Sequence, residues 1–308
     1  MTIRKWKNLL FLHKIEAQYG TDVLPTTADA MIGREVRFMP MKAQEESRDL
    51  LLPYLGNQGR VLTQVHGEIE IDIEIAGAGA AGDVPKYGSL LRACGLAETV
   101  TAGTDVTYSI IENGVESGTL YFNADGVQHI FVGTQANVSL AFTASKIPYF
   151  KVKLLGLLGT ITDVDLPAVT KAGWITPVPV NKANTTMTLH GWTAVSSTVS
   201  VDLGNTLTPR FLIGAEEIRI TDRTTTGSTV VDARSIATIN WFDIAQNSTR
   251  GALALQHGTV AGNIVEINAP AVEIGAPSQG QENNIINYTL PLALCTDAGL
   301  DELTITVR

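Results

Sequence analysis

The chain has 308 residues, of which 44% are hydrophobic and 17% are charged. This composition predicts one large or two medium domains with buried cores and excludes a disordered chain. The 22 basic and 31 acidic residues give a formal net charge of −9, which argues against binding DNA through Lys and Arg contacts to phosphates. The two cysteines, Cys94 and Cys295, are too few for a disulfide framework or a cysteine zinc site, and we expect small thiols in a reducing compartment.

The N-terminal segment has three basic residues followed by a short apolar run at residues 9–12. A signal peptide needs about 7–15 apolar residues and a membrane helix about 18 or more. We therefore expect a soluble chain that is not exported by this route.

The segment 39–60 carries mixed charges at one end and leucines and a tyrosine at the other. As an unpaired loop of about twenty residues between two strands, it would be long enough to suggest a binding role. The alternative is a short amphipathic helix or lid folded on its own core. The residues that we expect to carry the binding role are Glu45, Glu46, Arg48, Asp49, Leu50, Leu51, Leu52, Pro53 and Tyr54.

The clearest strand spans residues 66–76, where apolar and acidic residues alternate. Period two puts four isoleucines on one face and Glu68, Glu70, Asp72 and Glu74 on the other. Successive carboxylates would lie about 6.6–6.8 Å apart, so we expect them to repel one another and to stay hydrated. The acidic face is either an ordinary solvated sheet face or a surface that is electronegative for a purpose.

The segment 77–82 (GAGAAG) matches the G-x-G-x-x-G pattern of dinucleotide-binding proteins. The preceding strand alternates with carboxylates, whereas the first strand of that fold is buried on both faces. We therefore interpret the segment as a flexible Gly/Ala turn. The five histidines form no metal-binding pair and there is no G-x-S-x-G motif, so the sequence predicts no enzyme, no cofactor and no metal site.

The rest of the first half predicts a short helix at 87–94 and five strands, at 106–112, 120–122, 128–132, 138–142 and 149–155. Asn113-Gly114, Asp125-Gly126 and, in the second half, Thr226-Gly227 are expected turns. The second half predicts a helix at 236–246 and strands at 186–192, 199–203, 217–221, 228–232, 252–256, 264–267, 285–292 and 303–307.

This organisation predicts a mainly β protein with two similar domains. The first is residues 1–160, with an N-terminal arm at 1–33, and the second is residues 185–308. Residues 161–184, rich in Gly, Thr and Pro, are an expected linker. A local similarity between residues 132–138 and 257–264 supports a duplication, although one short similarity is weak evidence.

Several segments resemble the major tail tube proteins of long-tailed bacteriophages. In the first half these are residues 14–30 (KIEAQYGTDVLPTTADA) and 84–95 (VPKYGSLLRACG). In the second half they are residues 202–205 (DLGN), 220–223 (ITDR), 257–263 (HGTVAGN) and 301–307 (DELTITV). The resemblance covers nearly the whole chain, and its motifs carry no catalytic meaning.

The resemblance implies a tail-tube β-sandwich or barrel with a short flanking helix, whose sheets join between subunits into rings that stack into a tube. DNA would pass through the lumen without specific binding. The acidic residues 68–74 would line the lumen, and the segment 39–60 would contact the neighbouring ring. Implied partners are further copies of the chain and the tape measure, tail terminator and tail-tip proteins. The implied location is the virion tail, after synthesis in the host cytoplasm.

Three alternatives to a noncontractile tail tube stay open at this stage. The chain could form the inner tube of a contractile tail or of a phage-derived bacteriocin. It could instead be a decoration or binding β-sandwich of the virion. For the ring itself, the resemblance implies six tube folds, and two folds per chain would favour a trimer over a hexamer.

Overall fold

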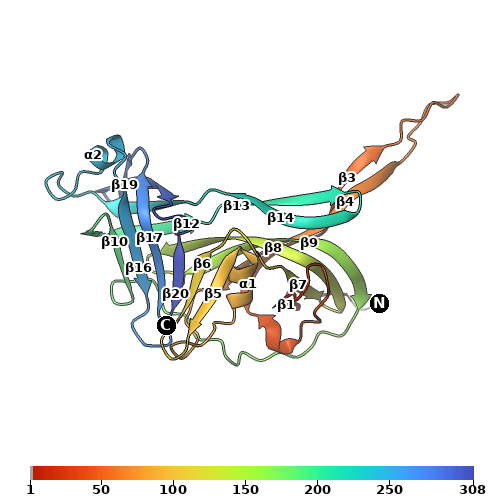
Figure 1. Ribbon diagram of the computed structural model, residues 1–308, viewed down its shortest axis with the longest axis horizontal. Helices are drawn as coiled ribbons and strands as arrows, with labels where there is room; N and C mark the ends of the chain where they lie inside the picture. The colour runs from red at the N-terminus through yellow and green to blue at the C-terminus, as the bar shows by residue number, and fades with distance from the viewer. Residues whose placement is uncertain (1–2) are drawn as a thin grey trace.

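The computed structural model describes residues 3–308, and its strands pair through antiparallel ladders throughout (Figure 1). Eighteen strands belong to one strongly curled sheet, and two form a separate hairpin. The prediction of a mainly β fold with short helices is confirmed.

The first group of strands follows the order β3-β4-β9-β8-β7-β1-β2 across the sheet. Its strands are β1 (Leu9–Ile15), β2 (Ala30–Met31), β3 (Gly33–Ser47), β4 (Arg60–Glu74), β7 (Gly118–Ala124), β8 (Val127–Thr143) and β9 (Tyr149–Asp163). A short 3-10 helix, η1 (Thr27–Asp29), precedes β2, and α1 (Gly88–Ala93) packs against β1 and β8.

The second group follows the order β12-β15-β19-β17-β16-β10-β11, with β18 extending β17 along β19. Its strands are β10 (Thr185–Leu189), β11 (Trp192–Thr193), β12 (Ser196–Asp202), β15 (Thr226–Asp232), β16 (Gly251–His257), β17 (Val265–Ile274), β18 (Ser278–Glu282) and β19 (Ile285–Cys295). The helix α2 (Trp241–Gln246) packs against β17.

Two junctions join the groups. The end of β8 pairs with β12, and β20 (Thr304–Val307) pairs with β17 on one side and with β6 (Asp105–Ile110) on the other. The hairpin partner of β6 is β5 (Leu96–Thr101). One core cluster consequently includes side chains of both halves, such as Ile71, Val106, Leu255 and Leu292.

The separate hairpin consists of β13 (Asn205–Leu212) and β14 (Ala215–Arg223) and lies across β8 and β9 (Figure 1). It prolongs the β12–β15 pair, because β13 follows β12 and β14 precedes β15 in the chain. In the same way, the outer part of the β3–β4 hairpin prolongs its own base.

Several predicted details are wrong. Residues 128–132 and 138–142 belong to one strand, β8, which is locally irregular between Val132 and Gln135. Thr226-Gly227 begins β15 instead of forming a turn, and Asn113-Gly114 does not join a hairpin, since β6 pairs with β5 and β20. The second helix is shorter than the predicted 236–246 segment.

Neither α-helix in the described part of the chain is long and apolar enough to cross a membrane.

Candidate functional site

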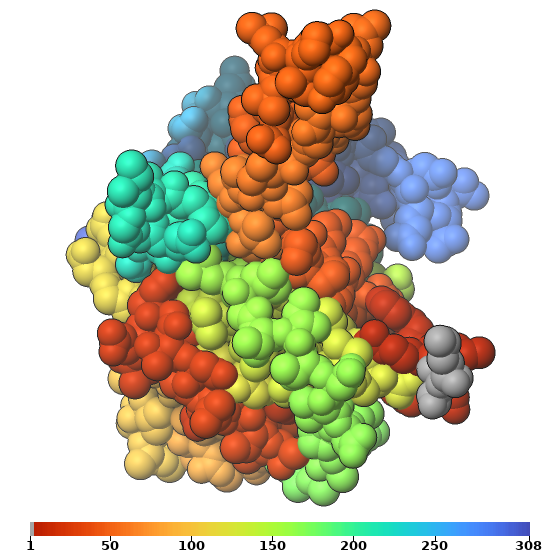
Figure 2. All heavy atoms as spheres, turned by 90° about the vertical axis from the view of Figure 1, so that its right-hand side faces the viewer, coloured from red at the N-terminus to blue at the C-terminus, as the bar shows by residue number. Residues whose placement is uncertain are grey.

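The β3–β4 hairpin projects from the body of the molecule (Figure 1). Its base is part of the sheet, because β4 pairs with β9 from His66 to Glu74. Beyond His66, β3 and β4 pair only with each other among the described residues, up to the pair Ser47 and Arg60. Figure 2 shows this ribbon standing clear of the rest of the molecule, with the β13–β14 hairpin beside it. A two-stranded ribbon without a core is marginally stable in water, so the outer part of this hairpin gains little stability from its own pairing.

Large apolar side chains are exposed along this ribbon. They are Met39, Met41, Leu50, Leu51, Leu52, Tyr54, Leu55, Val61 and Leu62. Leu51 and Leu55 have relative exposures of 102% and 101%. Single exposed leucines are ordinary, but so many on one projecting element mark an interaction surface.

The structure corrects the expected conformation of residues 39–60. Residues 39–47 belong to β3 and Arg60 begins β4, so the segment is the outer end of a β-hairpin whose connecting loop is residues 48–59. The alternative of a helix or lid with its own core is wrong, because Leu50, Leu52 and Tyr54 are exposed. Most residues of β3 are exposed on both faces and the strand contains Pro40, which explains why the sequence shows no alternation of apolar and polar residues there.

The four charged residues expected to carry the binding role are also exposed, and two of them, Glu45 and Asp49, are engaged within the hairpin. Arg60 forms an ion pair with Glu45 across the ribbon, and the Ser47 hydroxyl donates a hydrogen bond of 2.7 Å to Asp49. Glu46 and Arg48 are exposed. Surface pairs of this kind contribute little to stability, so these charges are available to orient a partner.

The face of β4 that carries the four carboxylates is flanked by basic residues on both neighbouring strands. Arg34 and Lys151 lie opposite Asp72, and Arg37 and Lys153 lie opposite Glu70. Paired positions of neighbouring strands share one face of the sheet, so these cations alternate with the carboxylates. The face therefore carries both signs of charge instead of being uniformly electronegative.

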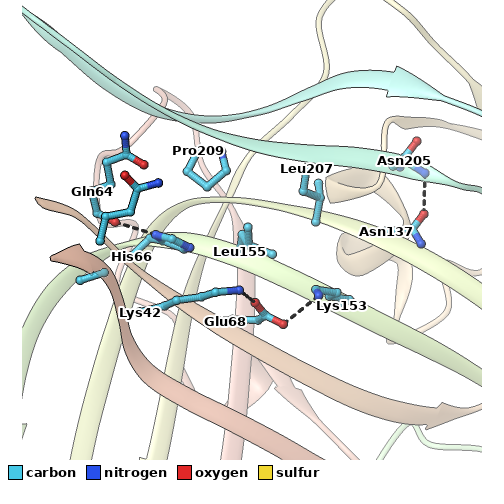
Figure 3. A pocket seen from close by; sticks show the side chains of 12 residues that line it. Lys42, Gln64, His66, Glu68, Asn137, Lys153, Leu155, Asn205, Leu207 and Pro209 are labelled. Atoms are coloured by element: carbon cyan, nitrogen blue, oxygen red, sulfur yellow. Dashed lines mark hydrogen bonds and ion pairs between the residues drawn. The ribbon is translucent and has the colours of Figure 1, made fainter.

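Glu68 is the most engaged of these carboxylates (Figure 3). Its two oxygens accept hydrogen bonds from Lys42 at 3.0 Å and Lys153 at 2.8 Å. Burial by itself would raise the pKa of Glu68, but the hydrogen bonds from Lys153 and Lys42 outweigh it and lower the pKa. Glu68 is thus held as a carboxylate between two ammonium groups.

The expectation that all four carboxylates are hydrated is wrong for two of them. Glu68 and Asp72 are each 8% exposed. Burial raises the pKa of Asp72, and the opposing effect of Lys151 is smaller. Glu70 and Glu74 are half-buried. The acidic row is therefore divided into two enclosed and two accessible carboxylates.

The β13–β14 hairpin encloses the Glu68 end of this face. Leu207 and Pro209 of β13 and Leu155 of β9 line a cleft of about 450 Å³ that also contains Glu68 (Figure 3). The ring of Phe211 lies 6.4 Å from that of His66. A hairpin from the second half of the chain thus covers the charged face of the first half.

Hydrogen bonds fix this hairpin to the sheet beneath it. The Asn205 amide group donates to the carbonyl oxygens of Cys94 at 2.7 Å and Ala136 at 3.1 Å. The Ile220 backbone amide donates to Gln135 at 2.7 Å, and the Tyr19 hydroxyl donates to the Ile218 carbonyl oxygen at 3.2 Å. The β13–β14 ribbon is therefore built onto the first half of the molecule, whereas the outer β3–β4 ribbon has no such contacts among residues 3–308.

The sequence reasoning missed the cations on β3 and β9. Their signal was present in β9, where Lys151 and Lys153 alternate with Phe150, Val152 and Leu154. β9 alternates basic and apolar residues as β4 alternates acidic and apolar residues. This pattern predicts a mixed-charge face only when β4 and β9 are known to be neighbouring strands. The exposed Met39, Met41, Val61 and Leu62 were also missed.

The glycine-rich segment 77–82 packs against another loop of the same chain. The Gly77 amide donates to Asn263 and the Gly79 amide to the Gly262 carbonyl oxygen, both at 2.8 Å. A Cβ atom at Gly77 would lie 2.1 Å from that carbonyl oxygen. These glycines therefore allow two backbones to approach closely, which explains the motif without a nucleotide.

No group of three or more His, Cys, Asp or Glu residues within the described range 3–308 could hold a metal ion. The geometry of the site is that of a protein interaction surface. A family model described as "Phage tail tube protein" matches residues 6–293. No curated protein matches the chain.

Proposed function

The chain belongs to the phage tail tube protein family, and from this membership we propose that it is a structural subunit whose copies assemble into stacked rings. The rings would form the tube through which DNA leaves the virion. The observation that carries the proposal is the projecting β3–β4 ribbon, whose exposed leucines, methionines and tyrosine have no partner within residues 3–308. Further copies of the chain would supply that partner.

We assign the end of this ribbon to contacts between rings. Residues 48–59 extend beyond the paired strands and combine exposed apolar side chains with the charged residues Arg48 and Asp49. Glu45 and Glu46, at the end of β3, add two carboxylates beside them. Burial of Leu50, Leu51, Leu52, Pro53 and Tyr54 against the next ring would supply the apolar part of the contact. The charges would set its orientation.

Two tube folds in each chain would make the ring a trimer with pseudo-sixfold form. The strand orders β3-β4-β9-β8-β7-β1-β2 and β12-β15-β19-β17-β16-β10-β11 correspond position by position. In both groups a short helix lies in the chain between the second strand of this order and the fifth. This correspondence supports domains at 1–160 and 185–308, and three chains would then supply six folds. A hexamer with peripheral second domains is the competing arrangement.

The accessible part of the charged face would line the lumen. Glu70 and Glu74 are its accessible carboxylates, while Glu68 and Asp72 on the same strand are buried. The cations of the face are opposed by carboxylates, for example Arg37 by Glu70 at 3.7 Å. Paired charges give a polyanion little net attraction, so DNA would move past this surface without being held.

The remaining partners follow from the position of a tube in a virion tail. They would be the tape measure protein inside the tube, the terminator at one end and the tip proteins at the other. The noncontractile tail is our preferred setting, and the inner tube of a contractile tail or bacteriocin is the alternative. A chain of this kind acts by assembly and not by catalysis.

The test is negative-stain electron microscopy of the purified full-length protein. We expect rings or tubes, and end-on views with three chains per ring and sixfold-like density. A protein that stays monomeric at high concentration would overturn the proposed function. Six chains per ring with residues 185–308 outside the barrel would overturn only the trimer.

A further inference from the structure

The joint between the two strand groups is a strand-to-strand contact within one chain. The last residues of β8 form an antiparallel ladder with β12, in which Thr143 lies opposite Thr198 and Ser139 opposite Asp202. From this joint the chain continues into β13–β14, which lies back over β8 and β9. A strand edge and a covering hairpin thus attach the second group to the first.

Each strand group also contains an element that corresponds to one strand of this joint but has an unpaired edge within residues 3–308. β3 corresponds to β12 and pairs only with β4 among the described residues. The end of β8 corresponds to β18, which continues β17 along β19 and pairs with β19 alone within the same range. All five residues of β18 are exposed. The first group therefore presents an edge equivalent to that of β12, and the second group presents an edge equivalent to that of the end of β8.

We propose that β18 of one subunit pairs with β3 of a second copy of the chain, repeating the β8–β12 joint between subunits. Open strand edges are pairing sites, and a chain that carries both complementary edges would be closed by its own copies. This inference rests on the proposed function, because it identifies the surfaces that would close the ring. Its occupant is a second copy of this chain.

The internal joint also gives the register of the proposed one. The corresponding strands β4 and β15 end at Glu74 and Asp232. Arg34 pairs with the residue two positions before the end of β4, and Thr198 pairs with the residue two positions before the end of β15, so Arg34 and Thr198 are equivalent. The same alignment makes Lys151 of β9 equivalent to Thr289 of β19. Ser139 pairs with Lys151 and Ser278 pairs with Thr289, so the two serines are equivalent.

The pair Thr198 and Thr143 of the internal joint then predicts that Arg34 lies opposite Glu282 of the next copy. The two side chains have opposite charges, and opposed charges on neighbouring strands favour pairing. Arg34 is available for this contact, since its present partners are the neighbouring Glu35 at 3.6 Å and the ring of Tyr149.

The internal joint also predicts which strands of the next copy the paired part of the projecting ribbon would cover. As β13–β14 covers β8 and β9, the ribbon of residues 39–47 and 60–65 would cover β17 and β19 of the next copy. The exposed residues on that face of β19 are apolar or small, namely Ile285, Pro291 and Ala293. These uncharged residues of β19 suit Met39, Met41 and Leu62 of the ribbon. The charge nearest to them is Glu273 of β17, which lies opposite Ala293 and is paired with Arg250 at 2.8 Å.

The test is disulfide cross-linking between subunits of the full-length protein. The variant Arg34→Cys/Glu282→Cys, made with Cys295→Ser while the buried Cys94 is kept, places the two thiols on opposed strand positions. Opposed Cβ atoms on paired strands lie about 4.5–5.5 Å apart, close to the separation of a disulfide. We expect covalent dimers and trimers under mild oxidation that disappear on reduction.

The matched control is Arg34→Cys/Ser278→Cys. Its second thiol lies four residues along β18, about 13 Å out of register, and we expect at least tenfold less cross-linking. Tubes that form without the 34–282 cross-link, or equal cross-linking in both variants, would overturn the proposed pairing alone. The absence of both tubes and cross-links would overturn the pairing together with the proposed function.

Discussion

The apolar end of the β3–β4 hairpin can be tested with the double variant Leu51→Ser/Leu55→Ser. Both side chains are fully exposed in the monomer, so the substitutions remove no internal packing and should leave the free energy of unfolding within about 0.5 kcal/mol of wild type. In an assembled tube the same leucines would be buried. Burying a leucine side chain stabilises by about 1.5–3 kcal/mol, so the variant should lose about 3–6 kcal/mol per contact.

This loss corresponds to a weakening of the contact by roughly 10²- to 10⁴-fold, since each 1.4 kcal/mol is about a factor of ten. Sedimentation of assembled protein over a range of concentrations measures the concentration at which tubes appear, and we expect it to rise accordingly. Val260→Ser, at an exposed apolar position on another loop, is the control. Tubes that form at the wild-type concentration from the double variant would refute the role of these leucines.

Three other predictions concern packing, pH and charge. Gly262→Ala would put a Cβ atom 2.4 Å from the Gly79 carbonyl oxygen at a φ of +83°, so it should cost about 2–4 kcal/mol in urea unfolding. Gly114→Ala, in open space at a φ of +73°, should cost about 1 kcal/mol, and equal losses would contradict the packing argument. Burial lowers the pKa of His13 to about 3, so the folded protein keeps this imidazole neutral while the unfolded chain protonates it below about pH 6.5. The free energy of unfolding therefore falls as the pH decreases from 6.5 towards 3. His13→Gln should flatten the decline of stability with falling pH by up to about 1.4 kcal/mol per unit between pH 6.5 and 4, and unchanged slopes would exclude this role. Glu70→Lys/Glu74→Lys should leave rings intact but give particles that retain DNA, and normal infectivity would argue against a lumen position.

Local sequence patterns predict the strands well where one face is buried. The alternation in β4 is confirmed, because Ile69, Ile71 and Ile73 all lie in the core. The Asp125-Gly126 turn is also confirmed, with φ values of 43° and 92°, since this dipeptide favours positive φ at both positions. In both cases residues adjacent in sequence determine the outcome.

Pairing between distant strands could not be predicted in the same way. Thr107 of β6 lies opposite Thr306 of β20, and no local pattern relates them. The dipeptide Asn113-Gly114 gives a local bend but does not identify the strands that pair on either side of it. The fold class was therefore predictable, whereas the interlocking of the two halves was not.

The same limit applies to the candidate site. The four carboxylates lie in a strand, β4, as predicted, but their charges were assessed without the basic residues of the neighbouring strands, namely Lys151, Lys153, Arg34 and Arg37. An acidic row among basic rows is a mixed surface, whereas the same row alone is electronegative. Electrostatic predictions from one strand thus depend on neighbours that only the topology supplies.

The two hairpins show how the position of a repeated element determines its surface. The β13–β14 hairpin ends in the short turn Ile213-Gly214, and its contacts are made within the chain. The outer ribbon of the β3–β4 hairpin, at the corresponding place in the first group, covers no sheet within residues 3–308, and residues 48–59 extend it further. A contact between subunits of one ring would require only the paired part of the ribbon, because the β13–β14 hairpin, with its short turn, is sufficient to cover the internal joint. The additional residues would then serve a different contact, between rings, so removing them should leave rings that do not stack.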